Sequence, residues 1–264
     1  MTERPRYYAD DGSRDSLTLD PRTIRIDNAR LWVQPPSLAR EGFALLPHRS
    51  DVSDFRNPQE IARIYGPETE RLLLELTNAD KVVLSALAVR RSADCSSGPV
   101  RLTSSGPLYE TRSVYFVHID ISDSTAVLFA QRFRPKDPVR PVRRVAHYNI
   151  WRALSPPPQD FPLALCDSRS VSPSDLVEAD AMMDIPGKPE SSYVGLVVRY
   201  NSKHRWSHFP DMNRDEVIVF KTHDSDPAHP KHVPHVAFND PTCPPGSVPR
   251  SSIEMRAIAY WFES

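Results

Sequence analysis

The spacing of hydrophobic residues along this chain changes from a helical period to a strand period. Over residues 57–77 the apolar side chains recur at three- and four-residue intervals, as in Ile61, Ile64 and Tyr65, which is the period of an amphipathic helix. An Asn-Pro pair opens this stretch and is a typical helix start, because Asn caps the free N–H groups and Pro fits the first helical position. Gly66-Pro67 predicts the end of this helix and the start of a second.

Short apolar runs bounded by proline and charged residues account for most of the remaining chain. They predict strands at residues 24–33, 41–50, 81–91, 114–121, 144–152, 193–200, 205–209, 216–222 and 252–262. Two further short helices are predicted, one capped by Asp123 and one over residues 172–182. Helices followed by many short strands favour an α+β protein built around a sandwich or barrel.

Charge and composition argue against several classes of partner. The 33 basic and 34 acidic residues give a net charge of −1, without the basic excess that nucleic-acid or membrane-surface binding usually requires. No apolar run has the length of a membrane span, and the charged N-terminal segment does not resemble a secretory signal. Cys95, Cys166 and Cys243 lack paired spacing, which is typical of reduced thiols inside the cell. We therefore expect a cytoplasmic protein with no nucleic-acid or membrane partner.

The predicted strand at residues 114–121 carries a candidate metal-binding pair, His118 and Asp120. Side chains two residues apart in a strand share a face, so the imidazole and the carboxylate lie side by side. Two histidines and one carboxylate on one face of a metal form the arrangement of non-haem Fe(II) oxygenases. The second histidine must then come from a distant segment, and the downstream candidates are His147, His204, His208, His223, His229, His232 and His235.

His235 is the best of these candidates, because it follows a proline-rich loop and opens a short apolar strand. There it can face a barrel interior while the loop leaves the metal accessible.

Polar and apolar side chains alternate along the last predicted strand, over residues 250–259. Its polar face presents Arg250, Ser252, Glu254 and Arg256, and its apolar face presents Ile253, Met255, Ala257 and Ala259. We expect the apolar face to pack against helices or a second sheet, and the arginines and the serine to bind a carboxylate.

Each of these features also has an ordinary structural interpretation. A single H-x-D sequence often occurs by chance, and His235 could be an ordinary loop residue. Arg250 could lie on the surface, and Arg256 could simply pair with Glu254. The order along the chain is more specific than any single feature: H-x-D on one strand, a distant histidine at a strand start, and R-x-S opening the last strand.

This order of motifs resembles the Fe(II)/2-oxoglutarate-dependent oxygenases. Within them the chain is most similar to the microbial natural-product enzymes that include aspergillic acid hydroxylase, the gibberellin desaturases and cephamycin methoxylase-like proteins. The similar segments are residues 40–55, 61–83, 117–120, 148–154, 161–167, 204–226 and 234–261. In one place the chain departs from the family, which usually has Tyr-Thr where this chain has Ile121-Ser122.

The resemblance implies a double-stranded β-helix core, the jelly-roll or cupin-like fold, with flanking helices. It implies one oxygenase domain over residues 1–264, with an extended arm over 1–25, a helical region over 40–80 and the jelly-roll core over 81–264. His118, Asp120 and His235 would hold Fe(II). Arg250 and Ser252 would bind the distal carboxylate of 2-oxoglutarate. Other motif positions, which the resemblance places near cosubstrate or substrate, are Arg256, Asn149, Trp151 and Arg152.

The activity implied is the oxidative decarboxylation of 2-oxoglutarate with O₂, coupled to hydroxylation, desaturation or oxidative cyclisation of a small secondary metabolite. The expected partner is that natural-product substrate, and a homodimer is possible. Two alternatives remain open: a jelly-roll iron enzyme that does not use 2-oxoglutarate, and a non-catalytic barrel that binds a small molecule.

Overall fold

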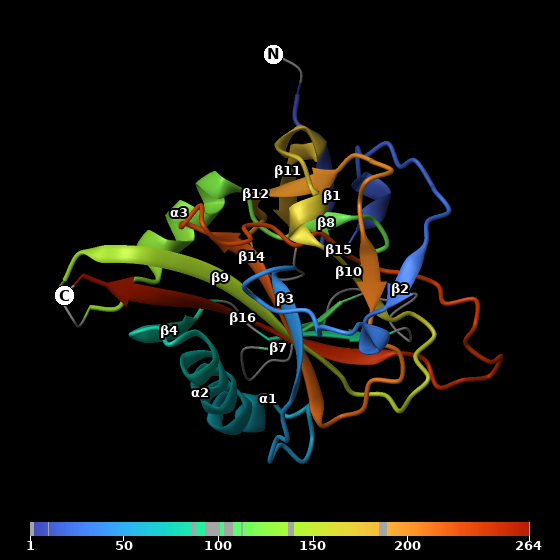
Figure 1. Cartoon of the computed structure of the whole chain (residues 1–264), viewed down its shortest axis with the longest axis horizontal. Coiled ribbons are helices and arrows are strands. Elements are labelled where there is room, and N and C mark those ends of the chain that lie inside the picture. The colour runs from blue at the N-terminus through green and yellow to red at the C-terminus, as the bar shows by residue number, and fades with distance from the viewer. Residues whose placement is uncertain are drawn as a thin grey trace.

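Two large β-sheets face each other in the computed structural model, with helices outside them (Figure 1). The structure describes residues 3–9, 11–85, 88–92, 101–102, 108–111, 113–136, 140–184 and 189–263. Asp120, which follows a strand of one sheet, contacts side chains from two strands of the other, so polar groups from both sheets meet in the space between them. None of the helices in this described part of the chain is long and apolar enough to cross a lipid bilayer.

The first sheet contains the strands that carry His118 and His235. In spatial order its strands are β1 (Arg6–Tyr8), β11 (Leu176–Met183), β12 (Ser191–Val198), β8 (His118–Ile119), β15 (His235–Ala237), β10 (Leu163–Cys166), β13 (Trp206–His208) and β2 (Ile26–Asn28). The pairings of β1 with β11 and of β13 with β2 are parallel, and the others are antiparallel.

The second sheet is built on two long strands. In spatial order its strands are β3 (Phe43–Pro47), β14 (Glu216–Asp224), β9 (Val142–Ala153), β16 (Ser251–Phe262), β5 (Ala88–Ser92), β7 (Leu108–Thr111) and β6 (Arg101–Leu102), and β4 (Lys81–Leu84) also pairs with β16. The predicted strand over 81–91 is therefore two strands, with residues 86–87 outside the described part of the chain.

The described part of the chain contains few helical elements. They are α1 (Pro58–Glu60), η3 (Ile61–Tyr65), α2 (Gly66–Thr77) and α3 (Asp123–Arg132), together with the 3₁₀ turns η1 (Gly12–Arg14), η2 (Ala29–Leu31), η5 (Ser168–Ser170) and η6 (Pro173–Asp175). The apolar face of β16 packs in one core cluster with Tyr65 and Leu73, as the sequence predicts for that face.

The predicted boundary at Gly66-Pro67 lies where η3 ends and α2 begins, but the predicted separation into two helices is wrong, because the helical path continues through it. Asn57 caps the first turn as expected, its side chain accepting from the Gln59 and Glu60 N–H groups. The five residues before Gly66 form a π-turn, and the Gly66 N–H donates to the carbonyl of Ile61. Proline has no N–H to donate, and a locally wider turn accommodates that loss without ending the helix.

The predicted helix over 172–182 is also wrong. Ser172 and Asp175 form a capping box, the local signal of a helix start, but it serves only the single turn η6. Strand β11 follows. In it Ala179 and Ala181 are buried, whereas Glu178 is exposed and Asp180 is only partly buried. This burial has the period of a strand, and pairing with β12 along eight residues determines the structure.

The segment around His118 is less regular than predicted. Only His118–Ile119 form a strand, and Asp120 lies in the bend that follows. Ser122, and not Asp123, caps α3, because its side chain accepts from the Thr125 N–H. The N-terminal segment predicted as an extended arm contributes strand β1, which pairs with β11 at one edge of the first sheet.

Candidate metal centre and substrate pocket

His118 and His235 are brought together by the pairing of β8 with β15, in which they are direct partners. Both side chains are buried, and their ring centroids are 4.4 Å apart. Nδ1 of His118 lies 3.0 Å from the carbonyl of Phe116, and Nδ1 of His235 lies 3.1 Å from that of Val233. A carbonyl only accepts hydrogen bonds, so each Nδ1 carries the proton and each Nε2 has the lone pair that can bind a metal.

Asp120 completes a cluster with these two histidines. One ligand atom from each of the three residues lies within 4.8 Å of the others, and Nε2 of His235 is 3.7 Å from Oδ2 of Asp120. Within the described ranges of the chain, this is the one group of three or more acidic, histidine or cysteine side chains with such spacing. The predicted triad is therefore adjacent in space.

The carboxylate of Asp120 is held on both oxygens. The Asn149 amide donates to Oδ2 at 2.6 Å, and the Arg256 guanidinium donates to Oδ1 at 2.6 Å. Burial alone would raise the pKa of Asp120, but the positive charge of Arg256 and the Asn149 hydrogen bond lower it. The pKa of Asp120 therefore lies well below its usual value, and the group is ionised at neutral pH.

Arg250 and Trp151 lie beside the histidine pair, since they share a cavity with His118 and His235. The buried guanidinium of Arg250 is 5.7 Å from the Trp151 ring and donates to Oγ of Ser113. Both side chains line a small cavity of about 20 Å³, together with His118, His235 and Glu254. Oγ of Ser252 is buried and has no hydrogen-bond partner among the described residues.

The resemblance also placed Asn149, Arg256 and Arg152 near cosubstrate or substrate. Asn149 and Arg256 contact Asp120, as described above. Arg152 lies outside the site, because it alternates with Trp151 on β9 and its guanidinium instead donates to the carbonyls of His48 and Arg214.

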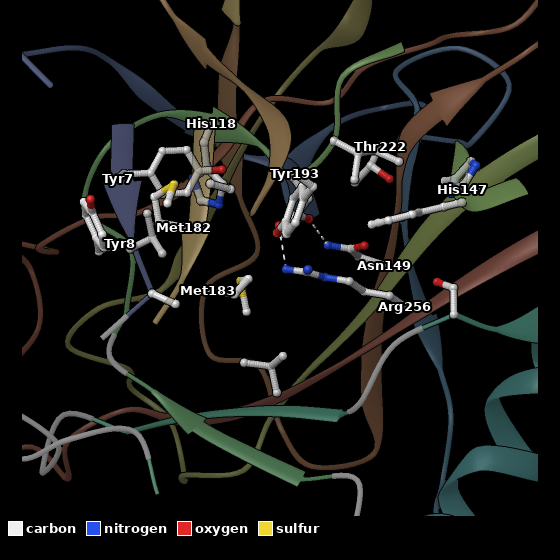
Figure 2. Close-up of a pocket in the computed structure, with 18 of the residues that line it drawn as sticks. Tyr7, Tyr8, His118, His147, Asn149, Met182, Met183, Tyr193, Thr222 and Arg256 are labelled. Carbon is white, nitrogen blue, oxygen red and sulfur yellow. Dashed lines mark hydrogen bonds and ion pairs between the residues drawn. The ribbon is translucent and has the colours of Figure 1, made fainter. Parts of the chain in front are cut away.

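A larger pocket of about 530 Å³ opens on the Asp120 side of the cluster (Figure 2). Figure 2 shows Tyr7, Tyr8 and Met182 on one side of it, and Asn149 and Arg256 on the other. Most of the lining is aromatic or aliphatic. Tyr7 and Tyr8 could not be predicted as lining residues, because the N-terminal segment lacks hydrophobic periodicity.

A second group of histidines lies beside α3. Nε2 of His232 is 3.1 Å from Oδ1 of Asp123, and Nε2 of His223 is 3.6 Å from the same oxygen. Asp224 does not join them, because it pairs with Lys221 and Arg144. The two adjacent side chains, His223 and Asp224, therefore have different partners, as expected for neighbours in a strand.

Comparison with known proteins identifies the family. The family model described as "Oxidoreductase/YMDC permease-like domain" matches residues 2–260. The chain belongs to this family. Hydroxylase/desaturase CTB9 of Cercospora beticola is 28% identical over 255 residues, covering 92% of this chain and 77% of CTB9. Fe(II)/2-oxoglutarate-dependent dioxygenase nvfI of Aspergillus novofumigatus is 25% identical over 252 residues, covering 91% of this chain and 84% of the relative.

A solved structure extends the comparison to the fold. The iron and alpha-ketoglutarate-dependent endoperoxidase NvfI superposes with a TM-score of 0.77 at 21% identity, covering 100% of this chain and 95% of that one. The predicted jelly-roll α+β fold is confirmed, and so is the resemblance to Fe(II)/2-oxoglutarate-dependent oxygenases of secondary metabolism. As a member of this oxidoreductase family, the chain is an enzyme.

Proposed function

We propose that this oxidoreductase uses Fe(II) and 2-oxoglutarate, and that His118, Asp120 and His235 hold the iron. The observation that carries the proposal is the meeting of two cross-strand histidines with the carboxylate of Asp120. Two imidazoles and one carboxylate on one face leave the opposite metal positions open, as the chemistry of non-haem Fe(II) oxygenases requires. The hydrogen bonds at both Nδ1 atoms support it, because they orient each Nε2 toward the cluster.

Arg250 and Ser252 are the residues that we propose for the distal carboxylate of 2-oxoglutarate. Arg250 is a buried cation near the histidine pair, and the Ser252 hydroxyl nearby is a buried polar group without a partner among the described residues. Such a hydroxyl is costly unless something binds it. The cavity beside Arg250 has room for about one water molecule, so Arg250 or its neighbours must move when 2-oxoglutarate enters.

When bound together, iron, 2-oxoglutarate and O₂ supply an oxidant for C–H bonds, with succinate and CO₂ as products. The chain itself orients the substrate and excludes water. We propose a largely apolar small molecule as that substrate, because the 530 Å³ pocket is lined mainly by aromatic and aliphatic side chains. Relatives are named hydroxylase/desaturase and endoperoxidase, so we propose hydroxylation, desaturation or oxidative cyclisation as the reaction type.

One observation favours a second candidate, an iron enzyme that does not use 2-oxoglutarate. Glu254 is buried and lines the cavity beside Arg250, where a dicarboxylate would have to bind. Like charges at short range disfavour binding. The pairing of Glu254 with Arg256 at 3.1 Å reduces this repulsion, and for that reason we prefer the 2-oxoglutarate-dependent enzyme.

Succinate formation tests the proposal and separates the candidates. The protein is incubated with Fe(II), O₂ and 2-oxoglutarate, and succinate is quantified. We expect succinate from the wild type and none above background from His118→Ala or Asp120→Ala. Arg250→Leu should raise the 2-oxoglutarate concentration required by about tenfold or more, since a hydrogen bond to a charged group contributes ~1.5–3 kcal/mol. Iron binding without succinate would favour the second candidate, and no iron binding would reject both.

The cytoplasmic location and the possible homodimer remain predictions. Of the three cysteines, Cys166 and Cys243 are free thiols in the described part of the chain. Cys95 lies outside the described residues.

A further inference from the structure

Two side chains from the second sheet converge on the proposed iron ligand of the first. Asn149 on β9 and Arg256 on β16 are direct cross-strand partners. They lie side by side at the pocket wall and point the same way (Figure 2). The first sheet therefore supplies the two histidines, and the second sheet supplies two hydrogen-bond donors to the Asp120 carboxylate.

The two donors use different oxygens of Asp120. Oδ2 accepts from Asn149 and is the oxygen 3.7 Å from Nε2 of His235, so it faces the space between the three ligands. Oδ1 accepts from Arg256 at 2.6 Å. An oxygen bound this closely by a guanidinium is a poor ligand for a cation, because the same lone pairs would face two positive charges.

Arg256 is itself fixed by its surroundings. Its Nε donates to Glu254 at 3.1 Å, and its guanidinium also contacts Tyr193. A planar guanidinium held on several sides cannot turn away from Asp120 without breaking these contacts. The orientation of the Asp120 carboxylate is thus determined by residues that do not belong to the predicted iron site.

We propose that Asn149 and Arg256 are positioning residues that make Asp120 a ligand through Oδ2 alone. This inference deepens the proposed function and rests on its metal site. A carboxylate bound through one oxygen occupies one metal position, whereas a freely rotating carboxylate can occupy two. Fixing Asp120 in this way would preserve the open positions that the cosubstrates need.

Metal titration without 2-oxoglutarate tests this inference. The purified protein is titrated with Mn(II) and with Co(II), and the visible absorption of bound Co(II) reports its coordination. We expect Asn149→Ala and Arg256→Met each to weaken Mn(II) binding by roughly 10- to 100-fold and to change the Co(II) spectrum. Arg256→Lys keeps the charge and should recover part of the affinity. Arg30→Met is the matched control, because it removes a guanidinium that pairs with Glu216 outside the metal cluster, and it should leave both readouts unchanged.

The outcomes distinguish the inference from the proposed function. If the wild type binds Mn(II) and His118→Ala does not, but Asn149→Ala and Arg256→Met bind like the wild type, the positioning role is wrong while the metal site stands. If Arg256→Met weakens only the binding of 2-oxoglutarate, Arg256 is a cosubstrate residue and the inference is overturned. If the wild type binds neither metal, the proposed function itself fails. Unchanged circular dichroism in each variant would exclude misfolding as the cause of a loss.

Discussion

His118 and His235 are direct partners across the β8–β15 pairing, with ring centroids 4.4 Å apart. In an antiparallel pair, residues opposite each other point to the same face. A slip of one residue in either strand would turn one imidazole to the opposite face of the sheet. The proposed metal centre therefore depends on the register of two very short strands, of two and three residues.

Metal binding should stabilise the folded protein. A ligand that binds only the native state at 100 times its Kd adds ~2.7 kcal/mol, so saturating Co(II) should raise the Tm of a domain of this size by roughly 5–10 °C. His235→Ala should abolish most of this increase. Differential scanning fluorimetry with and without Co(II) measures it. His229→Ala is the control, since His229 lies in a loop outside the cluster, and it should keep the full increase.

Acid should destabilise the fold through buried histidines. Burial, with help from the neighbouring His223, lowers the pKa of His147 to about 3, and burial lowers the pKa of His223 to about 4, from an ordinary 6.5. Below pH 6.5 the unfolded chain binds protons that the folded protein excludes, so stability should fall as the pH drops from 6.5 to 4. The free energy of unfolding should fall by at most ~1.4 kcal/mol per pH unit for each histidine.

Urea unfolding at several pH values measures this dependence. His147→Gln and His223→Gln each remove one such group, so each variant should lose less stability than the wild type between pH 6.5 and 5. Parallel curves for wild type and both variants would contradict the assignment of these histidines as neutral buried groups.

Asp224 should be essential for stability. Its fully buried carboxylate accepts from Lys221 at 2.7 Å and from Arg144 at 2.6 Å. Asp224→Asn leaves two cations without their counter-charge, and breaking a buried pair in this way costs about 3–5 kcal/mol. Chemical denaturation measures this loss. Asp51→Asn, the same change at an exposed position, should lower the free energy of unfolding by less than about 0.5 kcal/mol. Equal effects at the two positions would show that burial of the Asp224 pair is unimportant.

Gly195 should be intolerant of a side chain because of the N-terminal strand. A Cβ on Gly195 would lie 2.5 Å from the Tyr7 hydroxyl and 3.1 Å from the carbonyl oxygen of Asp120. We expect Gly195→Ala to destabilise the protein by about 1–3 kcal/mol, as overpacking does. Adding Tyr7→Ala removes the closer contact, so the double variant should recover part of the loss in a double-mutant cycle. Additive losses would mean that Tyr7 does not pack on Gly195.

The sequence predicted the proximity of His118, Asp120 and His235 from local signals and from the order of the motifs along the chain. Strand geometry predicted that His118 and Asp120 lie side by side, and they do, although Asp120 lies in the bend after β8. His235 is marked by its position at a strand start. The polar and apolar faces of β16 were predicted for the same reason. The roles of Asn149 and Arg256 could not be predicted, because their contact with Asp120 depends on the register between β9 and β16 and on the approach of the two sheets.

The errors arose where local signals compete with distant partners. The capping box at Ser172 is a true helix-start signal, but eight pairs with β12 override it after one turn. The two tyrosines of the N-terminal segment carry no periodic pattern, and their place in the pocket depends on pairing with residues far along the chain.

The parallel pairing of β1 with β11 also has a consequence for biosynthesis. Tyr7 is translated well before its partner Ala181, and His235 is translated later still. The pocket wall that Tyr7 lines and the proposed iron site thus cannot assemble until residue 235 has been translated. During that interval the N-terminal tyrosines have no native surface to cover them, so they are available to chaperones.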